Sequence, residues 1–148
     1  MSPNANNSFN VASANAKLNE VIAPWVQQLN LTVTEFGDGR VKLIMPFDET
    51  LCRSGGLICG QAMMAMIDTC MVFVSYLGAG KFIDCATVSQ STTFLRPAIH
   101  ADILATGHLK KSGRNLIFGD VTLTAGDSPD PVCTGSLTYA VIHKKLVS

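Results

Sequence analysis

The chain has 148 residues, a length that suits one domain with one hydrophobic core. Apolar side chains make up 47% of the sequence and charged ones only 15%. A monomer would therefore expose apolar surface, and we expect a homodimer or a homotetramer. Basic and acidic side chains number 11 each, and this zero net charge argues against nucleic acid as the main partner.

The five cysteines include no C-x-x-C pair, and the chain has only three histidines. This pattern contains no recognisable metal-ligand spacing, so we expect no metal site. Such cysteines are typical of a cytoplasmic protein, in which they stay reduced and act as small apolar residues. The polar segment 1–17 also lacks the apolar core of a signal peptide.

The first expected element is an amphipathic helix over about residues 14–29, because large apolar side chains recur there at helical spacing. Pro24 should bend this helix or split it in two. We expect a single domain over 1–148, in which residues 1–30 form a tail and helix and residues 31–142 form the core.

Two strands are expected next, over residues 31–36 and 40–46. They are joined by Gly37-Asp38-Gly39, which is a turn signal typical of a β-hairpin. A loop rich in turn formers, residues 48–56, then leads to a long apolar segment.

That apolar segment, residues 57–79, has the length and hydropathy of a membrane-spanning helix. Asp68 lies near its middle, where a charged residue costs about 2.5–3.5 kcal/mol on insertion scales, and no basic cluster flanks the segment. We therefore predict no membrane contact but a buried helix over residues 60–77, ended by Gly78-Ala79-Gly80.

Four further stretches have strand character and are separated by turn signals: residues 84–95, 101–110, 115–125 and 132–142. A helix that is apolar on all sides needs cover, and a strongly curved antiparallel sheet can supply it. The order of elements predicts an α+β protein of the hotdog fold, in which such a sheet wraps around a long central helix.

Asp68 is the residue that the predicted helix accommodates least easily. A charged, unpaired carboxylate among Met66, Ile67 and Met71 would cost several kcal/mol, and functional sites are where such placements are kept. The alternative is a structural aspartate that caps a loop or pairs with an arginine, Arg53 or Arg96.

Gly60 is the second candidate, because free N–H groups at a helix start can hold a developing oxyanion. Gly60 also lacks a Cβ, so that a thioester carbonyl could approach its amide closely. A plain helix-entry glycine is the alternative.

The segments 53–69 and 87–98 resemble the signature of the hotdog thioesterases related to the phenylacetate-degradation thioesterase PaaI. That signature consists of His-Gly-Gly, then six further residues, then Asp and often Thr. In this chain Cys59-Gly60-Gln61 occupies the His-Gly-Gly positions, and Asp68-Thr69 occupies the Asp-Thr positions. The second segment is similar to a family strand that ends in Phe-Leu-Arg-Pro, here Phe94 to Pro97.

The resemblance implies hydrolysis of an acyl-CoA thioester to a free acid and CoA, with no metal or redox cofactor. Asp68 would be the general base, or less readily the nucleophile, and the Gly60 amide would be the oxyanion donor. Thr87 would help to position the attacking water. The family's active site lies between protomers, so that Asp68 of one copy would face Gly60 of the other.

Two positions depart from the family pattern. Cys59 occupies the position of the family's His, and Arg53 occupies a position where the family often has Asn. These departures put substrate positioning and the polar half of the acyl site in doubt. The residues expected to contact substrate are Arg53, Cys59, Gln61, Arg96, Lys110, Lys111 and Arg114. Of these, the basic residues near the turn at 111–113, with Arg96, could meet the phosphates of CoA or could simply be solvated.

Three alternatives remain at this stage. Cys59 could be a nucleophile, because a helix start can lower the pKa of a thiol, although all three histidines lie beyond residue 99. A hotdog dehydratase would need a His paired with an acidic residue, and no His lies on the central helix. A non-catalytic module that binds acyl-CoA is the rival from another functional class.

Overall fold

The computed structural model describes residues 8–143. Its first helix, α1 (Val11–Val21), begins with a capping box, in which the Asn10 side chain accepts a hydrogen bond from the Ser13 amide at 3.0 Å. A short second helix, α2 (Pro24–Gln27), starts with the proline, which cannot donate a hydrogen bond to the preceding turn. The predicted split at Pro24 is therefore confirmed, and the first helix starts three residues earlier than expected.

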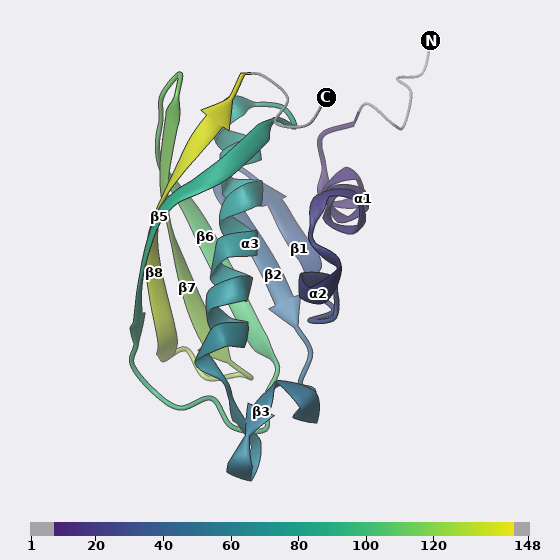
Figure 1. Ribbon diagram of the computed structural model, residues 1–148, viewed down its shortest axis with the longest axis vertical. Helices are drawn as coiled ribbons and strands as arrows, with labels where there is room; N and C mark the ends of the chain where they lie inside the picture. Colours follow the sequence, from purple (N-terminus) through teal and green to yellow (C-terminus); the bar gives the residue numbers. More distant parts are fainter. Residues whose placement is uncertain (1–7, 144–148) are drawn as a thin grey trace.

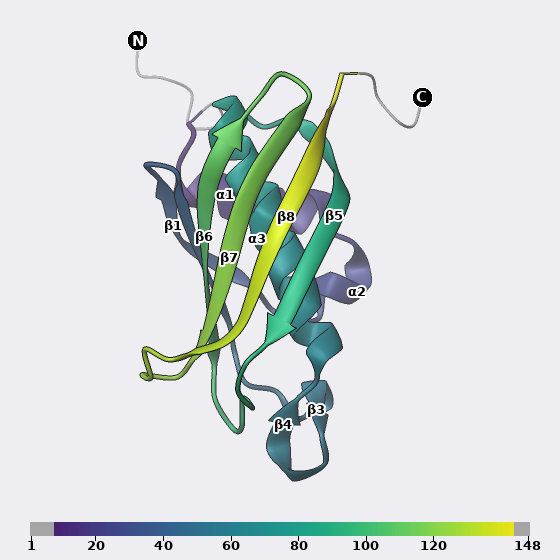
Figure 2. The ribbon, with the colours of Figure 1, turned by 90° about the vertical axis from the view of Figure 1, so that its left-hand side faces the viewer.

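All six predicted strands are present in one sheet, and every neighbouring pair is antiparallel. The strands are β1 (Thr32–Gly37), β2 (Arg40–Met45), β5 (Asp84–Phe94), β6 (Ile103–Ser112), β7 (Leu116–Ala125) and β8 (Pro131–Ile142). Their order in the sheet is β1-β2-β6-β7-β8-β5, so that β1 and β5 are the two edges (Figure 2).

The loop before the central helix contains a second, two-stranded sheet, which the sequence did not indicate. Its strands are β3 (Cys52–Arg53) and β4 (Leu57–Ile58), and two short 3-10 helices, Glu49–Leu51 and Ser54–Gly56, complete the loop. This small ladder lies at the start of the central helix, at the lower end of the molecule in Figure 2.

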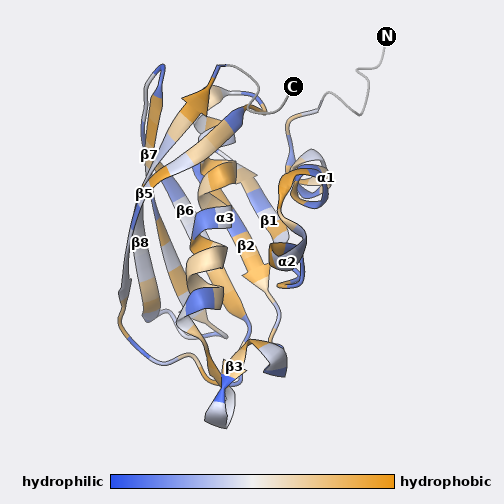
Figure 3. Ribbon diagram, viewed as in Figure 1, coloured by the Kyte–Doolittle hydropathy of each residue, from blue (hydrophilic) through white to orange (hydrophobic). Residues whose placement is uncertain are grey.

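The central helix, α3 (Gly60–Ala79), runs along the concave face of the sheet (Figure 1). It continues two residues beyond the predicted end, and Gly80 then takes a left-handed conformation with φ 71°. Within residues 8–143 it is the one helix long and apolar enough to cross a membrane by length and composition. The sheet covers it instead: 61% of its most apolar window is buried, and polar turns interrupt its apolar surface (Figure 3).

Close approach of α3 to the sheet depends on a glycine in each of β6, β7 and β8: Gly107, Gly119 and Gly135. A Cβ added at Gly119 would lie 2.8 Å from Sδ of Met71, and one added at Gly135 would lie 2.7 Å from Cγ2 of Ile67. Because these three sheet residues have no side chain, the side chains of α3 can pack directly against the backbone of the sheet.

The two edge strands of the sheet differ in what contacts their backbone. At β1, the side chain of Asn15 from α1 donates to the Val33 carbonyl at 2.9 Å and accepts from the Val33 amide at 2.8 Å. At β5, the 11 residues of the strand pair with β8 on one side and with no second strand among the described residues. Val88 lies on this open edge with 58% of its surface exposed.

Candidate active site at the open edge of the sheet

Asp68 lies in the middle of α3 and is hydrogen-bonded to two neighbouring strands. The Thr87 hydroxyl, from β5, donates to Oδ1 of Asp68 at 2.8 Å. The Tyr139 hydroxyl, from β8, lies 2.6 Å from the same oxygen and 2.7 Å from the main-chain carbonyl of Asp68. The central helix and the strands β5 and β8 therefore position one carboxylate.

The two carboxylate oxygens of Asp68 have different surroundings. Burial, and then the nearby Asp68 carboxylate, raise the pKa of Tyr139 well above its usual range, so Tyr139 keeps its proton and remains a donor. Oδ1 thus accepts from two hydroxyl groups, whereas no donor to Oδ2 occurs among residues 8–143. An anchored carboxylate with one free oxygen is suited to accept a proton from a bound water.

Asp68 belongs to the stripe of α3 that the sheet leaves least covered. Between Gly60 and Phe73, the residues that are not buried are Gln61, Met64, Ala65, Asp68 and Val72. Their spacing of three and four residues places them on one side of the helix. Met64 is 42% exposed, so this stripe presents apolar surface on both sides of the carboxylate.

Gly60 begins α3 and lines a cavity of about 450 Å³, which we call the helix-start cavity. Its lining consists of Arg53, Leu57, Ile58, Gly60, Met63, Phe94, Leu95, Arg96 and Pro97. The Phe94 ring lies so close that a Cβ at residue 60 would be 3.2 Å from its Cζ. Because glycine has no Cβ, it leaves space between the Phe94 ring and the start of α3.

Gly60 and Asp68 of one copy do not face one common point. They are eight residues apart on the same helix, which corresponds to about 12 Å along its axis. A carbonyl held by the Gly60 amide would lie far beyond hydrogen-bond reach of Asp68 in the same copy.

Cys59 and Gln61 lie on a different side of the helix start from the helix-start cavity. They line a smaller hollow of about 220 Å³, together with Trp25 and Gln28 of the second helix region. His100, the histidine nearest to Cys59 in the sequence, packs its ring against Gly56, and its amide donates to the Gly56 carbonyl at 3.1 Å. Among residues 8–143, no His, Asp or Glu side chain is hydrogen-bonded to the Cys59 thiol.

The basic residues expected at the substrate separate into groups. Arg53 and Arg96 line the helix-start cavity, where Arg96 donates to the Pro131 carbonyl at 2.7 Å. Lys110 lies 3.5 Å from Asp120, and Lys111 is an exposed residue of β6. Arg114 lies at the opposite end of α3, so one copy of the chain does not bring all these residues together.

Arg114 is part of the lining of a second cavity, of about 550 Å³, which we call the helix-end cavity. The end of α3, the start of β5, the β6–β7 turn and the end of β8 meet there, at the top of Figure 1. Besides Arg114, it contains the charged or titratable residues Lys81, Asp84 and His143.

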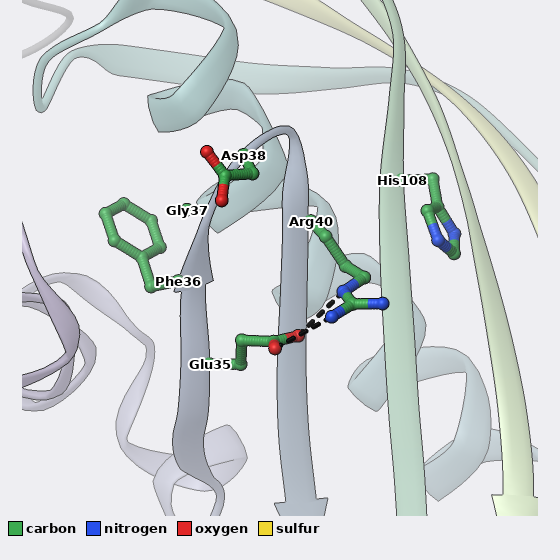
Figure 4. Close-up of a pocket in the computed structure, with 6 residues that line it drawn as sticks. All are labelled: Glu35, Phe36, Gly37, Asp38, Arg40 and His108. Carbon is green, nitrogen blue, oxygen red and sulfur yellow. Dashed lines mark hydrogen bonds and ion pairs between the residues drawn. The ribbon is translucent and has the colours of Figure 1, made fainter.

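A third cavity, of about 400 Å³, lies at the β1–β2 turn and is shown in Figure 4. Its arginine is already paired, because Nε of Arg40 lies 2.7 Å from Oε2 of Glu35 and Nη2 donates to Oε1 at 2.9 Å. This hydrogen bond lowers the pKa of Glu35. His108, on β6, lines the same hollow.

Among residues 8–143, no group of three or more His, Cys, Asp or Glu side chains is placed to hold a metal ion. The candidate site thus consists of the Asp68 carboxylate, its two hydroxyl donors and the helix start at Gly60. Sequence reasoning missed Tyr139, although a tyrosine on the inward side of a strand needs a partner for its hydroxyl.

Comparison with known proteins identifies the family. A model of the thioesterase superfamily matches residues 55–132, which is more than half of the chain. A candidate esterase of Thermoplasma acidophilum is 25% identical over 120 residues, covering 81% of this chain and 89% of that protein.

Solved structures show the same architecture. A candidate thioesterase of Silicibacter sp. TM1040 is 26% identical with a TM-score of 0.81, covering 92% of this chain and 94% of that one. Zebrafish thioesterase superfamily member 2 shares the fold at 21% identity and a TM-score of 0.80, covering 91% of this chain and 100% of that one. The chain therefore belongs to the thioesterase superfamily and is a hotdog-fold thioesterase.

Proposed function

We propose that the protein hydrolyses an acyl-CoA thioester to a free acid and CoA, as a PaaI-like thioesterase, with Asp68 as the general base. The observation that carries the proposal is the asymmetric binding of Asp68, in which Oδ1 is anchored by Thr87 and Tyr139. The free oxygen, Oδ2, takes a proton from water while the water oxygen attacks the carbonyl carbon. The C–S bond then breaks, and the departing CoA thiolate receives the proton that Asp68 took from the water, which regenerates the carboxylate.

The Gly60 amide is the proposed donor to the oxyanion, and a second copy of the chain supplies it. The separation of about 12 Å between Gly60 and Asp68 on one helix supports this division between two copies. A two-fold axis that pairs two β5 edges would run the two α3 helices in opposite directions. The start of one helix would then come beside the middle of the other.

The exposed stripe of α3 and the open edge of β5 support a homodimer. Both surfaces adjoin Asp68, and both carry exposed apolar side chains, Met64 on the helix and Val88 on the strand. Pairing of two edges would supply partners for the backbone N–H and C=O groups of β5 and cover these side chains.

The test of the proposed chemistry is Asp68→Asn, which keeps the size of the side chain but removes the base. We expect kcat on acyl-CoA substrates to fall by about 10²–10⁴-fold with unchanged circular dichroism. Cys59→Ser is the matched comparison at the helix start, and it should keep activity within about tenfold. Unchanged turnover in a folded Asp68→Asn variant would exclude the mechanism, and loss of activity in Cys59→Ser with an acyl adduct on Cys59 would replace it.

A single turnover in water enriched in ¹⁸O distinguishes a base from a nucleophile. Direct attack by water places the label in the acid product of the first turnover. Attack by Asp68, followed by hydrolysis of the mixed anhydride at the Asp68 carbonyl, would instead transfer an unlabelled carboxylate oxygen to the product and leave the label on Asp68. A panel of acyl-CoA substrates that all bind without hydrolysis would point to the non-catalytic binding module.

A further inference from the structure

The helix-end cavity concentrates positive charge in a protein of zero net charge. Lys81, on the α3–β5 connection, and Arg114, on the β6–β7 turn, line it together with His143 at the end of β8. Asp84 is the one acidic residue of the lining. The Lys81 and Arg114 side chains are hydrogen-bond donors suited to an anion with several oxygens, and Nε2 of His143 lies 3.1 Å from Oδ1 of Asn115.

These cations have no carboxylate partner within the part of the chain that the structure describes. Neither Lys81 nor Arg114 is in an ion pair within residues 8–143, whereas the arginine of the β1–β2 cavity is neutralised by Glu35. Two of the last carbonyls of α3 already have other partners. The Gly78 carbonyl accepts from the Ser112 hydroxyl at 2.7 Å, and the Leu77 carbonyl accepts from the Gly80 amide at 3.2 Å.

The position of the cavity relative to Asp68 is suited to one part of an acyl-CoA molecule. Thr87, which holds Asp68, and Asp84, which lines the cavity, are three residues apart on β5, or about 10 Å. From Asp68 to Gly78 the helix rises by about 15 Å. The extended pantetheine arm, which separates the thioester of CoA from its diphosphate, spans a distance of this order.

We propose that the helix-end cavity binds the phosphate groups of the CoA moiety, with Lys81, Arg114 and His143 as the contacting residues. This inference rests on the proposed function and deepens it by assigning the two ends of the substrate. The thioester lies at Asp68, and the pantetheine arm follows β5 toward Asp84. The more apolar helix-start cavity is then left for the acyl group.

The experiment compares two thioesters of the same acyl group, one on CoA and one on N-acetylcysteamine, which has no phosphate. In the double variant Lys81→Ala/Arg114→Ala, KM for the acyl-CoA should rise at least tenfold while kcat changes little. KM for the N-acetylcysteamine thioester should stay the same. Lys42→Ala is the control, because it removes a cation from the outer side of β2, away from the cavity.

Binding of adenosine 3′,5′-bisphosphate, measured by calorimetry, tests the cavity without relying on catalysis. The wild type and Lys42→Ala should bind it, and the folded double variant should bind at least tenfold more weakly. If bisphosphate binding shows this pattern but no thioester is hydrolysed, the cavity assignment stands and the proposed function fails. Normal hydrolysis with an unchanged KM for acyl-CoA and unchanged bisphosphate affinity in the double variant would overturn the inference.

Discussion

The two edges of the sheet differ in what covers them. At β1, the protein closes the edge itself, because α1 packs there and Asn15 binds both backbone groups of Val33. At β5, the chain has no charged side chain between Asp84 and Arg96, although charges are a common protection for an exposed edge. An unprotected edge of this length is unusual unless something pairs with it.

The open edge is also the edge that carries the proposed site. Thr87 of β5 holds Asp68, and the register of β5 against β8 shifts immediately after it, between Thr87 and Ser89. Val88 is the extra residue of this bulge, and it is exposed. The protein thus covers the edge remote from Asp68 and leaves uncovered the edge next to Asp68, where we propose that a second copy completes the site.

The largest effect is expected from a charge on the open edge. Val88→Lys places a positive charge on each of the two β5 strands that would pair, and the two charges would repel each other. We expect monomers in sedimentation. We also expect the rate of hydrolysis to fall by about 100-fold or more, as when an oxyanion donor is removed. Val21→Lys is the control, because Val21 is also exposed, at 47%, but lies on α1 near the closed edge. A fully active, dimeric Val88→Lys would show that β5 is not the interface.

A smaller effect is expected at the closed edge, and it concerns stability. Asn15→Leu leaves the buried amide and carbonyl of Val33 without their partners, so the free energy of unfolding should fall by about 1–3 kcal/mol. Asn15→Asp keeps the acceptor for the amide and should lose less. Urea denaturation measures both variants, and hydrolysis by the folded protein should be unchanged. Equal stability of wild type and Asn15→Leu would contradict the closure of this edge by Asn15.

The smallest effect is expected from Tyr139→Phe, which removes one of the two hydroxyl groups on Oδ1 of Asp68. Thr87 still holds the carboxylate, so kcat should fall by about tenfold or less, a barrier change of about 1.4 kcal/mol. The only other tyrosine of the chain, Tyr76, is buried on α3 and provides the control. Tyr76→Phe should leave kcat unchanged, and an equal loss in both variants would mean that the effect is one of packing.

Local patterns in the sequence predicted most of the fold. The six strands and the central helix follow from apolar periodicity and from turn residues, and their observed bounds differ from the expected ones by three residues or fewer. The N-terminal helix was less well delimited, since the capping box at Asn10 lies outside the apolar pattern. Asp68 was recognisable because one carboxylate stands out in a long apolar segment.

The tertiary structure alone decided the rest. Tyr139 contacts Asp68 from 71 residues away, and a strand pattern tells which side a residue faces but not which atom it meets. The need for glycine at positions 107, 119 and 135 follows only from the packing of α3 against these residues. The basic residues near α3 were likewise separated into two cavities by strand order. Periodicity arises from interactions over a few residues, whereas these contacts depend on how distant segments are brought together.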